Sequence, residues 1–219
     1  MEEIADSTKK QLSEVGKEII SLQDKGMTFN QIREELKVRV GSIIASSVRE
    51  SYLLGFSFVE QFNQRTIKLK ESHLKDIDKQ VQEQTQSFWN NVRKITSKQK
   101  SSSVAAAAGP GDLLLINTFN RFFASSAITM NFFALNQATL NTSRQFFSEK
   151  VPGIGKVQAE ILEPQFIWVT RKDDRVDPDC LNLQGRTWGV FDNDLIRPPL
   201  HFGCRCRLLP LEKGKVYNG

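Results

Sequence analysis

The stretch from Pro198 to Cys206 reads PPLHFGCRC, and it contains two of the three cysteines and one of the two histidines of this 219-residue chain. The third thiol, Cys180, closes the short acidic segment DPDC at residues 177–180. Three thiols and one imidazole form a ligand set that fills a tetrahedral zinc shell. This clustering makes Cys180, His201, Cys204 and Cys206 candidate metal ligands.

Two other interpretations fit the same residues. In a strand, Cys204 and Cys206 would share one buried face with Leu208, and Arg205 and Arg207 would lie on the opposite face. Cysteine often serves as a small buried hydrophobe, and the spacing lacks a CxxC knuckle, so a plain core strand explains this alternation without a metal. A disulfide from Cys180 to either of the other thiols is the third option, although it would leave one cysteine unpaired.

The chain before the cysteines reads as helical up to about residue 96. Apolar residues from Ile4 to Leu22 recur at intervals of three and four, and Gly26 is a natural stop. Thr28 and Gln31 have the spacing of a capping box that starts a second helix. A third apolar stripe runs from Leu74 to Ile95, and His73 beside it is expected on the surface. A helix-turn-helix DNA reader is the rarer interpretation of the first pair, since a basic recognition face is missing.

The segment from Leu113 to Phe147 combines aromatic richness with almost no charge. It holds seven of the 15 phenylalanines, and only Arg121 and Arg144 are charged. A helix that is apolar on more than one side is usually the centre of a bundle. Interfaces between subunits are also enriched in aromatic side chains and poor in charge. We therefore expect a central core helix, and we hypothesise that part of it contacts other subunits.

Two regions follow from this pattern. Residues 1–150 are expected to be helical, with a linker or hinge at about 97–112, where Ser, Ala, Gly and Pro accumulate. Residues 151–219 are expected to form a small β module with strands near 166–170, 186–191 and 205–209. The predicted fold class is α+β. A module this small commonly needs a metal staple, which agrees with the cysteine clustering.

The C-terminal residues resemble a known family, the phage Mu F-type minor head proteins of tailed viruses. The likeness covers about residues 166–210 and rests on Trp168-Val169-Thr170, Asp174-Arg175-Val176, Cys180 with Leu183-Gln184-Gly185, and Pro198-Pro199-x-His201-x-x-Cys204-Arg205-Cys206. Many members carry a further cysteine where this chain has Asp177, which leaves Asp177 as an oxygen ligand or an outer hydrogen-bond acceptor.

The resemblance implies a role in virus assembly. Family members lie in few copies inside the capsid near the portal protein, so it implies a head morphogenesis or DNA-delivery protein, made in the host cytoplasm and oligomeric in the particle. Its expected partners are the portal, other capsid subunits and double-stranded DNA. The net charge of +5 is modest, so we expect weak, non-specific DNA binding through Arg186, Arg205 and Arg207.

An enzymatic role is the alternative. A metal-dependent hydrolase or a toxin-like enzyme of viral origin would need an open metal position and a base such as Asp177 or Asp179. Four protein ligands would fill the zinc shell, and the sequence has no phosphate-binding loop, HExxH motif or nucleophile elbow. We therefore expect a structural zinc and no catalytic residues. No apolar run reaches the length of a membrane span.

Overall fold

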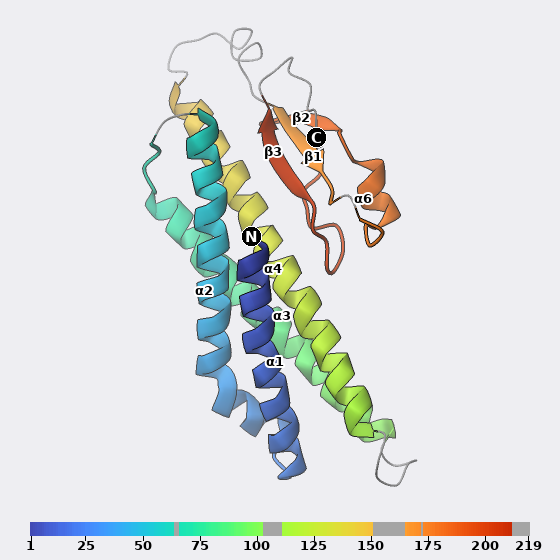
Figure 1. The fold of residues 1–219 in the computed structure, drawn as a ribbon. Coiled ribbons are helices and arrows are strands. Elements are labelled where there is room, and N and C mark those ends of the chain that lie inside the picture. The colour runs from blue at the N-terminus through green and yellow to red at the C-terminus, as the bar shows by residue number, and fades with distance from the viewer. Residues whose placement is uncertain (64–65, 103–110, 151–164, 172, 212–219) are drawn as a thin grey trace.

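The computed structural model describes residues 1–63, 66–102, 111–150, 165–171 and 173–211. In these residues, four long helices form an elongated bundle, and a small sheet lies along one side of it (Figure 1). The helices are α1 (Glu2–Asp24), α2 (Phe29–Asn63), α3 (Glu71–Ser102) and α4 (Gly111–Lys150). The β module consists of β1 (Gln165–Val169), the short helix α6 (Pro178–Asn182), β2 (Thr187–Gly189) and β3 (Arg207–Leu211).

The break between the first two helices lies where the sequence predicts it. Gly26 has a φ of +81°, a left-handed conformation that glycine adopts without a Cβ clash. Thr28 N–H donates to Gln31 Oε1 at 2.9 Å, and Gln31 N–H donates to Thr28 Oγ1 at 3.4 Å. This reciprocal pair is a capping box, and α2 begins directly after Thr28.

Helix α4 is the centre of the molecule, which confirms the prediction of a central core helix. It contacts α1, α2 and α3 within the bundle and strand β3 of the module. Four of its phenylalanines are buried (Phe119, Phe123, Phe132 and Phe146), and three are half-buried (Phe122, Phe133 and Phe147). Because these three rings are partly exposed, they could still contact another subunit, and that expected contact stays a prediction.

The bundle core also contains a buried polar network. Thr8 of α1 hydrogen-bonds to Ser47 of α2 at 2.7 Å, and Ser51 donates to Asn131 Oδ1 of α4 at 2.7 Å. Asn131 Nδ2 donates in turn to the carbonyl of Ala127. Because these side chains are satisfied only in one register of the three helices, the network specifies how the helices align.

The expectation of a surface position for His73 is wrong. His73 is 2% exposed, and its ring packs edge-on against the rings of Tyr52 and Phe56 from α2. The side chain also has a local role at the start of α3, because Lys70 N–H donates to His73 Nδ1 at 3.1 Å. The sequence around His73 is polar and does not predict its burial, because the rings of Tyr52 and Phe56 that cover it belong to another helix.

Helix α3 differs from the sequence expectation at both ends. Leu74 is 44% exposed, so the buried stripe begins at Ile77. The helix continues to Ser102, so residues 97–102 of the expected linker are helical, and α4 already begins at Gly111. The rest of that linker, residues 103–110, lies outside the described residues.

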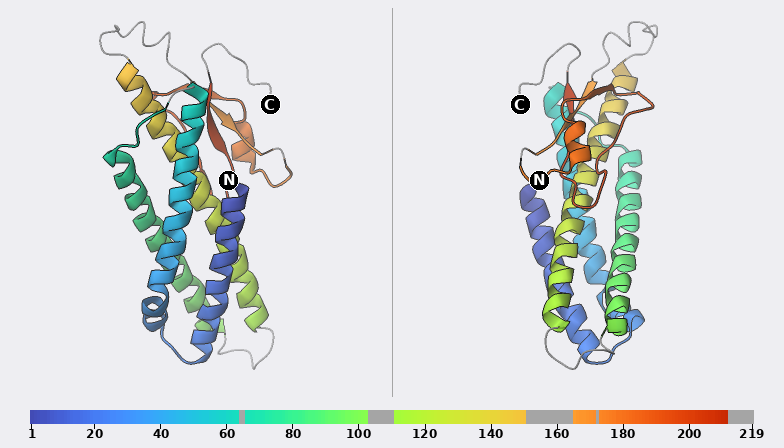
Figure 2. Two further views of the ribbon diagram at one scale, coloured as in Figure 1. Left: turned by 60° about the vertical axis from the view of Figure 1, so that its left-hand side comes forward. Right: turned by 90° about the vertical axis from the view of Figure 1, so that its right-hand side faces the viewer.

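The sheet has the order β2-β1-β3, and both pairs are antiparallel. The strand expected near 166–170 matches β1 closely. The strand expected near 205–209 begins two residues later, as β3, so Cys204 and Cys206 precede it, and β2 is limited to three residues of the predicted 186–191 segment. Figure 2 shows from two further directions that the sheet and α6 lie against the upper half of α4, close to the N-terminal end of α1. None of the helices in the described part of the chain is long and apolar enough to cross a membrane.

Candidate metal centre

Cys180 is presented by a single helical turn with a defined start. Asp177 is the N-cap of α6, and its Oδ1 accepts a hydrogen bond from Asp179 N–H at 3.0 Å. Pro178 follows at the first helical position, where its missing N–H costs nothing. This start directs the Cys180 side chain into the module core, where it is 1% exposed. Asp177 is thus engaged as a helix cap, and Asp174 and Asp179 are exposed.

His201 and Cys204 stand at the two ends of one tight turn. Cys204 N–H donates to the His201 carbonyl at 3.1 Å. Gly203, the third residue of that turn, has a φ of +82°, as a type II turn requires. The turn brings the imidazole and the thiol to the same side of the backbone, which explains why an HFGC sequence suits a metal-binding loop.

The side chains of Cys180, His201 and Cys204 converge. Their ligand atoms all lie within 4.8 Å of one another, close enough to hold a metal ion. Cys180 Sγ is 3.7 Å from Cys204 Sγ and 3.2 Å from His201 Nε2. Zinc–sulfur bonds of about 2.3 Å in a tetrahedron separate two sulfurs by about 3.8 Å, so the thiol pair fits a zinc shell. All three cysteines are free thiols, so the disulfide option is not realised.

Cys206 adjoins this cluster as a third thiol. It is 3% exposed, but it is not part of the group of ligand atoms that lie within 4.8 Å of one another. Its interaction with Cys204 lowers the pKa of the Cys204 thiol to about 5. Desolvation raises the pKa of Cys180 to about 11. The hydrogen bond to Cys204 also raises the pKa of Cys206. The pKa of Cys204 is therefore lowered, whereas the pKa values of Cys180 and Cys206 are raised.

The backbone next to the cluster orients the His201 ring. His201 Nδ1 lies 3.2 Å from the Phe202 carbonyl. The tautomer with its proton on Nδ1 donates to that carbonyl and leaves the Nε2 lone pair facing Cys180, as metal-bound histidines usually require. The chain from Cys204 to Leu208 alternates as predicted: Cys204, Cys206 and Leu208 are buried, and Arg205 and Arg207 are half-buried.

Helix α4 holds the segment from Phe202 to Leu208, which contains two of the metal candidates, in place through its polar side chains. Asn136 Nδ2 donates to the Cys206 carbonyl at 3.0 Å, and Asn136 Oδ1 accepts from Leu208 N–H at 2.8 Å. This amide pairs with the outer edge of β3 as a neighbouring strand would. Two more contacts join α4 to the His201–Cys204 turn. Gly203 N–H donates to Thr129 Oγ1 at 2.7 Å, and the Phe202 ring stacks on the Phe122 ring.

Other residues of the resemblance also meet in space. Gln184 Oε1 accepts hydrogen bonds from the Thr170 N–H and hydroxyl, both at 2.6 Å. Gly185 N–H donates to the Trp168 carbonyl at 2.9 Å, and Trp168 N–H donates to the Arg186 carbonyl at 2.9 Å. These contacts join the Trp-x-Thr strand to the segment that follows α6, so both frame the core that contains the three thiols.

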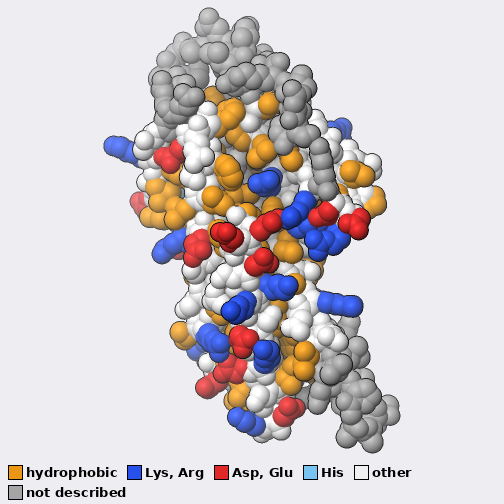
Figure 3. Space-filling model, viewed as in Figure 1, with side chains coloured by type: hydrophobic (Ala, Val, Ile, Leu, Met, Phe, Trp, Pro, Cys, Tyr) orange, Lys and Arg blue, Asp and Glu red, His pale blue; other side chains and the backbone are white. Residues whose placement is uncertain are grey.

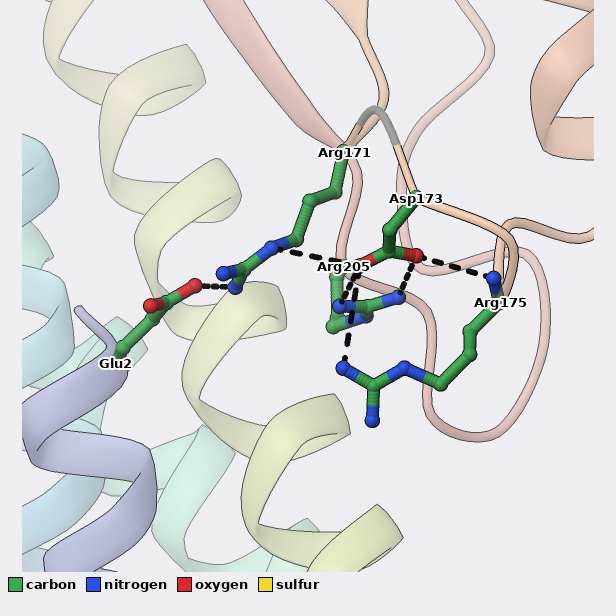
Figure 4. Close-up of polar contacts among 5 residues, drawn as sticks. All are labelled: Glu2, Arg171, Asp173, Arg175 and Arg205. Atoms are coloured by element: carbon green, nitrogen blue, oxygen red, sulfur yellow. Dashed lines mark hydrogen bonds and ion pairs between the residues drawn. The ribbon is translucent and has the colours of Figure 1, made fainter.

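Asp173 lies at the centre of a charged cluster beside the metal candidates (Figure 4). Arg205 forms a bidentate pair with it, with nitrogen–oxygen distances of 2.7 and 2.6 Å. Arg171 and Arg175 approach the same carboxylate at 3.5 and 3.9 Å. Arg171 also pairs with Glu2 at the start of α1. Figure 3 shows basic and acidic side chains interleaved across this middle part of the molecule.

The three candidate DNA contacts have different surroundings. The Arg205 side chain is 13% exposed and is taken up by Asp173. Arg207 is half-buried and lines a groove that also contains Glu2 and Glu3. Arg186 is exposed, and its guanidinium lies 5.9 Å from the centre of the Trp188 ring. Of the three, Arg186 is the most available to a phosphate backbone.

The sequence analysis missed Asp173, Thr129 and Asn136. The sequence offers little reason to select Asp173, because several aspartates precede Cys180. Asp173 differs from the others only through its ion pair with Arg205, which the sequence does not reveal. The signal for Thr129 and Asn136 was present, since uncharged polar side chains in a central helix need partners. Their partners lie about 70 residues further along the chain, where neither spacing nor periodicity can identify them.

The cavity that borders the cluster is small. It is lined in part by Asp177, Cys180, His201, Arg205 and Cys206, and its volume is about 10 Å³. A single water needs about 10–15 Å³ on this measure. A hydrolytic metal centre must admit both a water and a substrate, so this space suits a closed shell better than an open one.

Comparison with known proteins gives no relative for this chain. It matches no protein-family model, and neither the curated proteins nor the solved structures contain a significant match. The arguments about function therefore rest on the residues and their geometry.

Proposed function

We propose that this chain is a minor head protein of a tailed virus or prophage, with a structural zinc ion bound by Cys180, His201, Cys204 and Cys206. The observation that carries the proposal is the convergence of Cys180 and His201, 21 positions apart, with Cys204 in one buried cluster. These are the residues that the resemblance to F-type minor head proteins singles out. Zinc at this point would join α6 to the His201–Cys204 turn and stabilise a module with a small core.

The geometry favours zinc over other metals. Thiolate and imidazole ligands select zinc, copper(I) or iron, whereas magnesium, calcium and manganese prefer oxygen ligands. The sulfur separation of 3.7 Å matches the edge of a zinc tetrahedron. Cys206 is not among the three residues whose ligand atoms converge, and we propose it as the fourth ligand because its buried thiol adjoins Cys180 and Cys204 closely enough to shift their pKa values. In this arrangement the metal supplies cross-linking and no chemistry.

The hydrolase alternative is supported less well by the same geometry. A catalytic centre would need an open coordination position with a base beside it. Of the two candidate bases, Asp177 accepts a hydrogen bond as a helix cap and Asp179 is exposed. The adjoining cavity is about 10 Å³. A structural role is therefore the preferred proposal.

The protein composition of purified virus particles tests the proposed role as a minor head protein. Cells that carry the gene within an inducible prophage are induced, and the released particles are purified and analysed by mass spectrometry. We expect the protein in intact heads at a copy number well below that of the major capsid protein, and its co-purification with the portal after mild disruption. Its absence from particles made by cells that contain the protein would refute the proposal.

DNA contact is the second part of the role and has its own test. Phosphate contacts neutralise charge without reading sequence, so four contacts predict a log–log salt slope of about −3 to −4 on duplex DNA. Fluorescence anisotropy at low salt measures it. Arg186→Glu should weaken binding more than Arg205→Glu, because Arg205 is engaged by Asp173. Binding that ignores salt would leave only the protein–protein role.

A further inference from the structure

We propose that Arg205 and Asp173 form a clamp that positions the metal ligands, so that the Arg205–Asp173 ion pair sets the metal affinity of the centre. Arg205 is a positioning residue in this account. It touches no metal and acts through Cys204 and Cys206, its two neighbours in the chain. The inference rests on the metal centre proposed above and adds to it the residues that hold its two halves in register.

The first support is the placement of the two partners in the chain. Asp173 lies in the connection between β1 and α6, four residues before the cap of the helix that carries Cys180. Arg205 lies between two thiols of the other ligand segment. The ion pair, drawn in Figure 4, therefore joins the same two segments that the metal would join.

The second support is the rigidity of the contact. Both guanidinium nitrogens of Arg205 reach Asp173, at 2.7 and 2.6 Å. Asp173 Oδ1 also accepts a hydrogen bond from Arg175 N–H at 3.1 Å, which fixes the carboxylate on its own loop. A bidentate pair sets orientation as well as distance. With the Arg205 side chain only 13% exposed, the pair is screened by solvent less than a surface pair is.

The third support is electrostatic. A zinc ion with three thiolates and one imidazole carries a net charge of about −1, which is costly in a buried site unless a cation lies near. Arg205 stands between Cys204 and Cys206 in the chain, and it lines the same small cavity as Cys180 and Cys206. The Arg205 guanidinium is therefore close enough to offset the charge of the ligands.

The clamp also reaches the helical bundle. Arg171 contacts Asp173 at 3.5 Å on one side and Glu2 of α1 on the other. This chain of charges connects the first turn of α1 to the loop before Cys180.

The test uses Co²⁺ as a spectroscopic probe of the full-length protein, with zinc affinity measured by competition. Variants Arg205→Gln and Asp173→Asn remove either half of the clamp, and Arg207→Gln removes an equal charge two residues further along. We expect each clamp variant to lose about 10–100-fold in Co²⁺ affinity, as removal of outer-shell partners does. The double variant should lose no more than either single one, and Arg207→Gln should stay within about twofold of the unchanged protein.

Two further readouts separate positioning from general stability. The absorption bands of saturated Co²⁺ report the shell geometry, and they should shift in both clamp variants. Arg205→Lys keeps the charge but loses the bidentate geometry, so it should recover less than half of the lost binding free energy. If Arg205→Gln does not fold, Asp173→Asn alone decides the same question.

The inference is overturned if the clamp variants bind Co²⁺ within about twofold of the unchanged protein, or if Arg207→Gln loses as much affinity as they do. Weaker binding with unchanged absorption bands would also overturn it, because the ion pair would then stabilise the fold alone. If the unchanged protein binds neither Co²⁺ nor zinc, the metal centre itself is refuted. Particle composition tests the viral role independently of these outcomes.

Discussion

Asp173 is the residue whose charge the fold controls most directly. The hydrogen bond from Arg205 lowers its pKa to about 2, from an ordinary value of 3.8. A carboxyl with a depressed pKa stabilises the fold at every pH above its unfolded pKa, and that contribution disappears as the pH falls through the folded pKa. The stabilisation by the ion pair should therefore be complete from neutral pH down to about pH 5, shrink below about pH 4 and be lost as the pH falls through about 2.

Urea unfolding of the metal-free protein tests this dependence, with Asp173→Asn as the comparison. The unchanged protein should be the more stable of the two at pH 7, by the same margin at about pH 5, and the margin should close between about pH 4 and pH 2. Metal is removed beforehand because thiol protonation would release it over the same range. A margin that survives at pH 2 would show that the asparagine variant is destabilised for a reason other than charge.

The residue scale also shows what the sequence can and cannot predict. The alternation of Cys204, Cys206 and Leu208 with two arginines was predictable, because local backbone geometry alone produces it. The burial of His73 was not, because the rings that cover it come from α2. The role of Asp173 was not predictable either, since an ion pair across 32 residues leaves no periodic trace.

At the scale of elements, Asn136 connects α4 to the edge of β3. Replacing it with alanine leaves the Leu208 N–H and the Cys206 carbonyl without a partner in a buried position. We expect Asn136→Ala to destabilise the protein by about 1–3 kcal/mol. Asn120→Ala, on an exposed turn of the same helix, should change stability by less than about 0.5 kcal/mol. Thermal unfolding of the two variants measures the difference, and equal effects would contradict the role of the Asn136 amide.

The crossing of α2 and α4 depends on Gly55. A Cβ at this position would lie 2.4 Å from the Leu135 carbonyl oxygen and 2.8 Å from Ala138 Cβ. Since backbone must move to relieve this overlap, Gly55→Ala should cost about 1–3 kcal/mol. Gly41 lies in the same helix with nothing within 4 Å of its added Cβ, so Gly41→Ala should stabilise by up to about 1 kcal/mol. Chemical denaturation gives both values, and effects of the same sign would refute this account of the crossing.

The helices and strands were largely predictable from the sequence, whereas the contacts between them were not. Apolar spacing predicted α1 and α2, and the Thr28–Gln31 pair predicted the start of α2. The segment from Leu113 to Phe147, with only two charged residues, predicted a central α4. The extension of α3 to Ser102 was missed because serine and lysine are also common in linkers. Neither spacing nor composition predicted that α4 would supply the side chains that hold the segment from Phe202 to Leu208.

At the scale of the whole molecule, metal removal should affect one part of the chain. The metal candidates lie in the β module, whereas the bundle has its own apolar core and polar network. Free zinc at 1,000 times its dissociation constant stabilises a folded state by about 4 kcal/mol. We therefore expect a chelator to raise amide hydrogen exchange in residues 165–211 while α1 and α2 stay protected. Uniform loss of protection, or no change, would contradict a staple confined to the module.

The central claim is that one zinc ion is held by three sulfurs and one imidazole nitrogen. X-ray absorption spectroscopy at the zinc edge, on protein purified without added metal, tests it most directly. The account predicts about one zinc per chain, with three sulfurs at about 2.3 Å and one nitrogen at about 2.0–2.1 Å. A protein without zinc, or a shell with two sulfurs and a water oxygen in place of the Cys206 thiol, would contradict it.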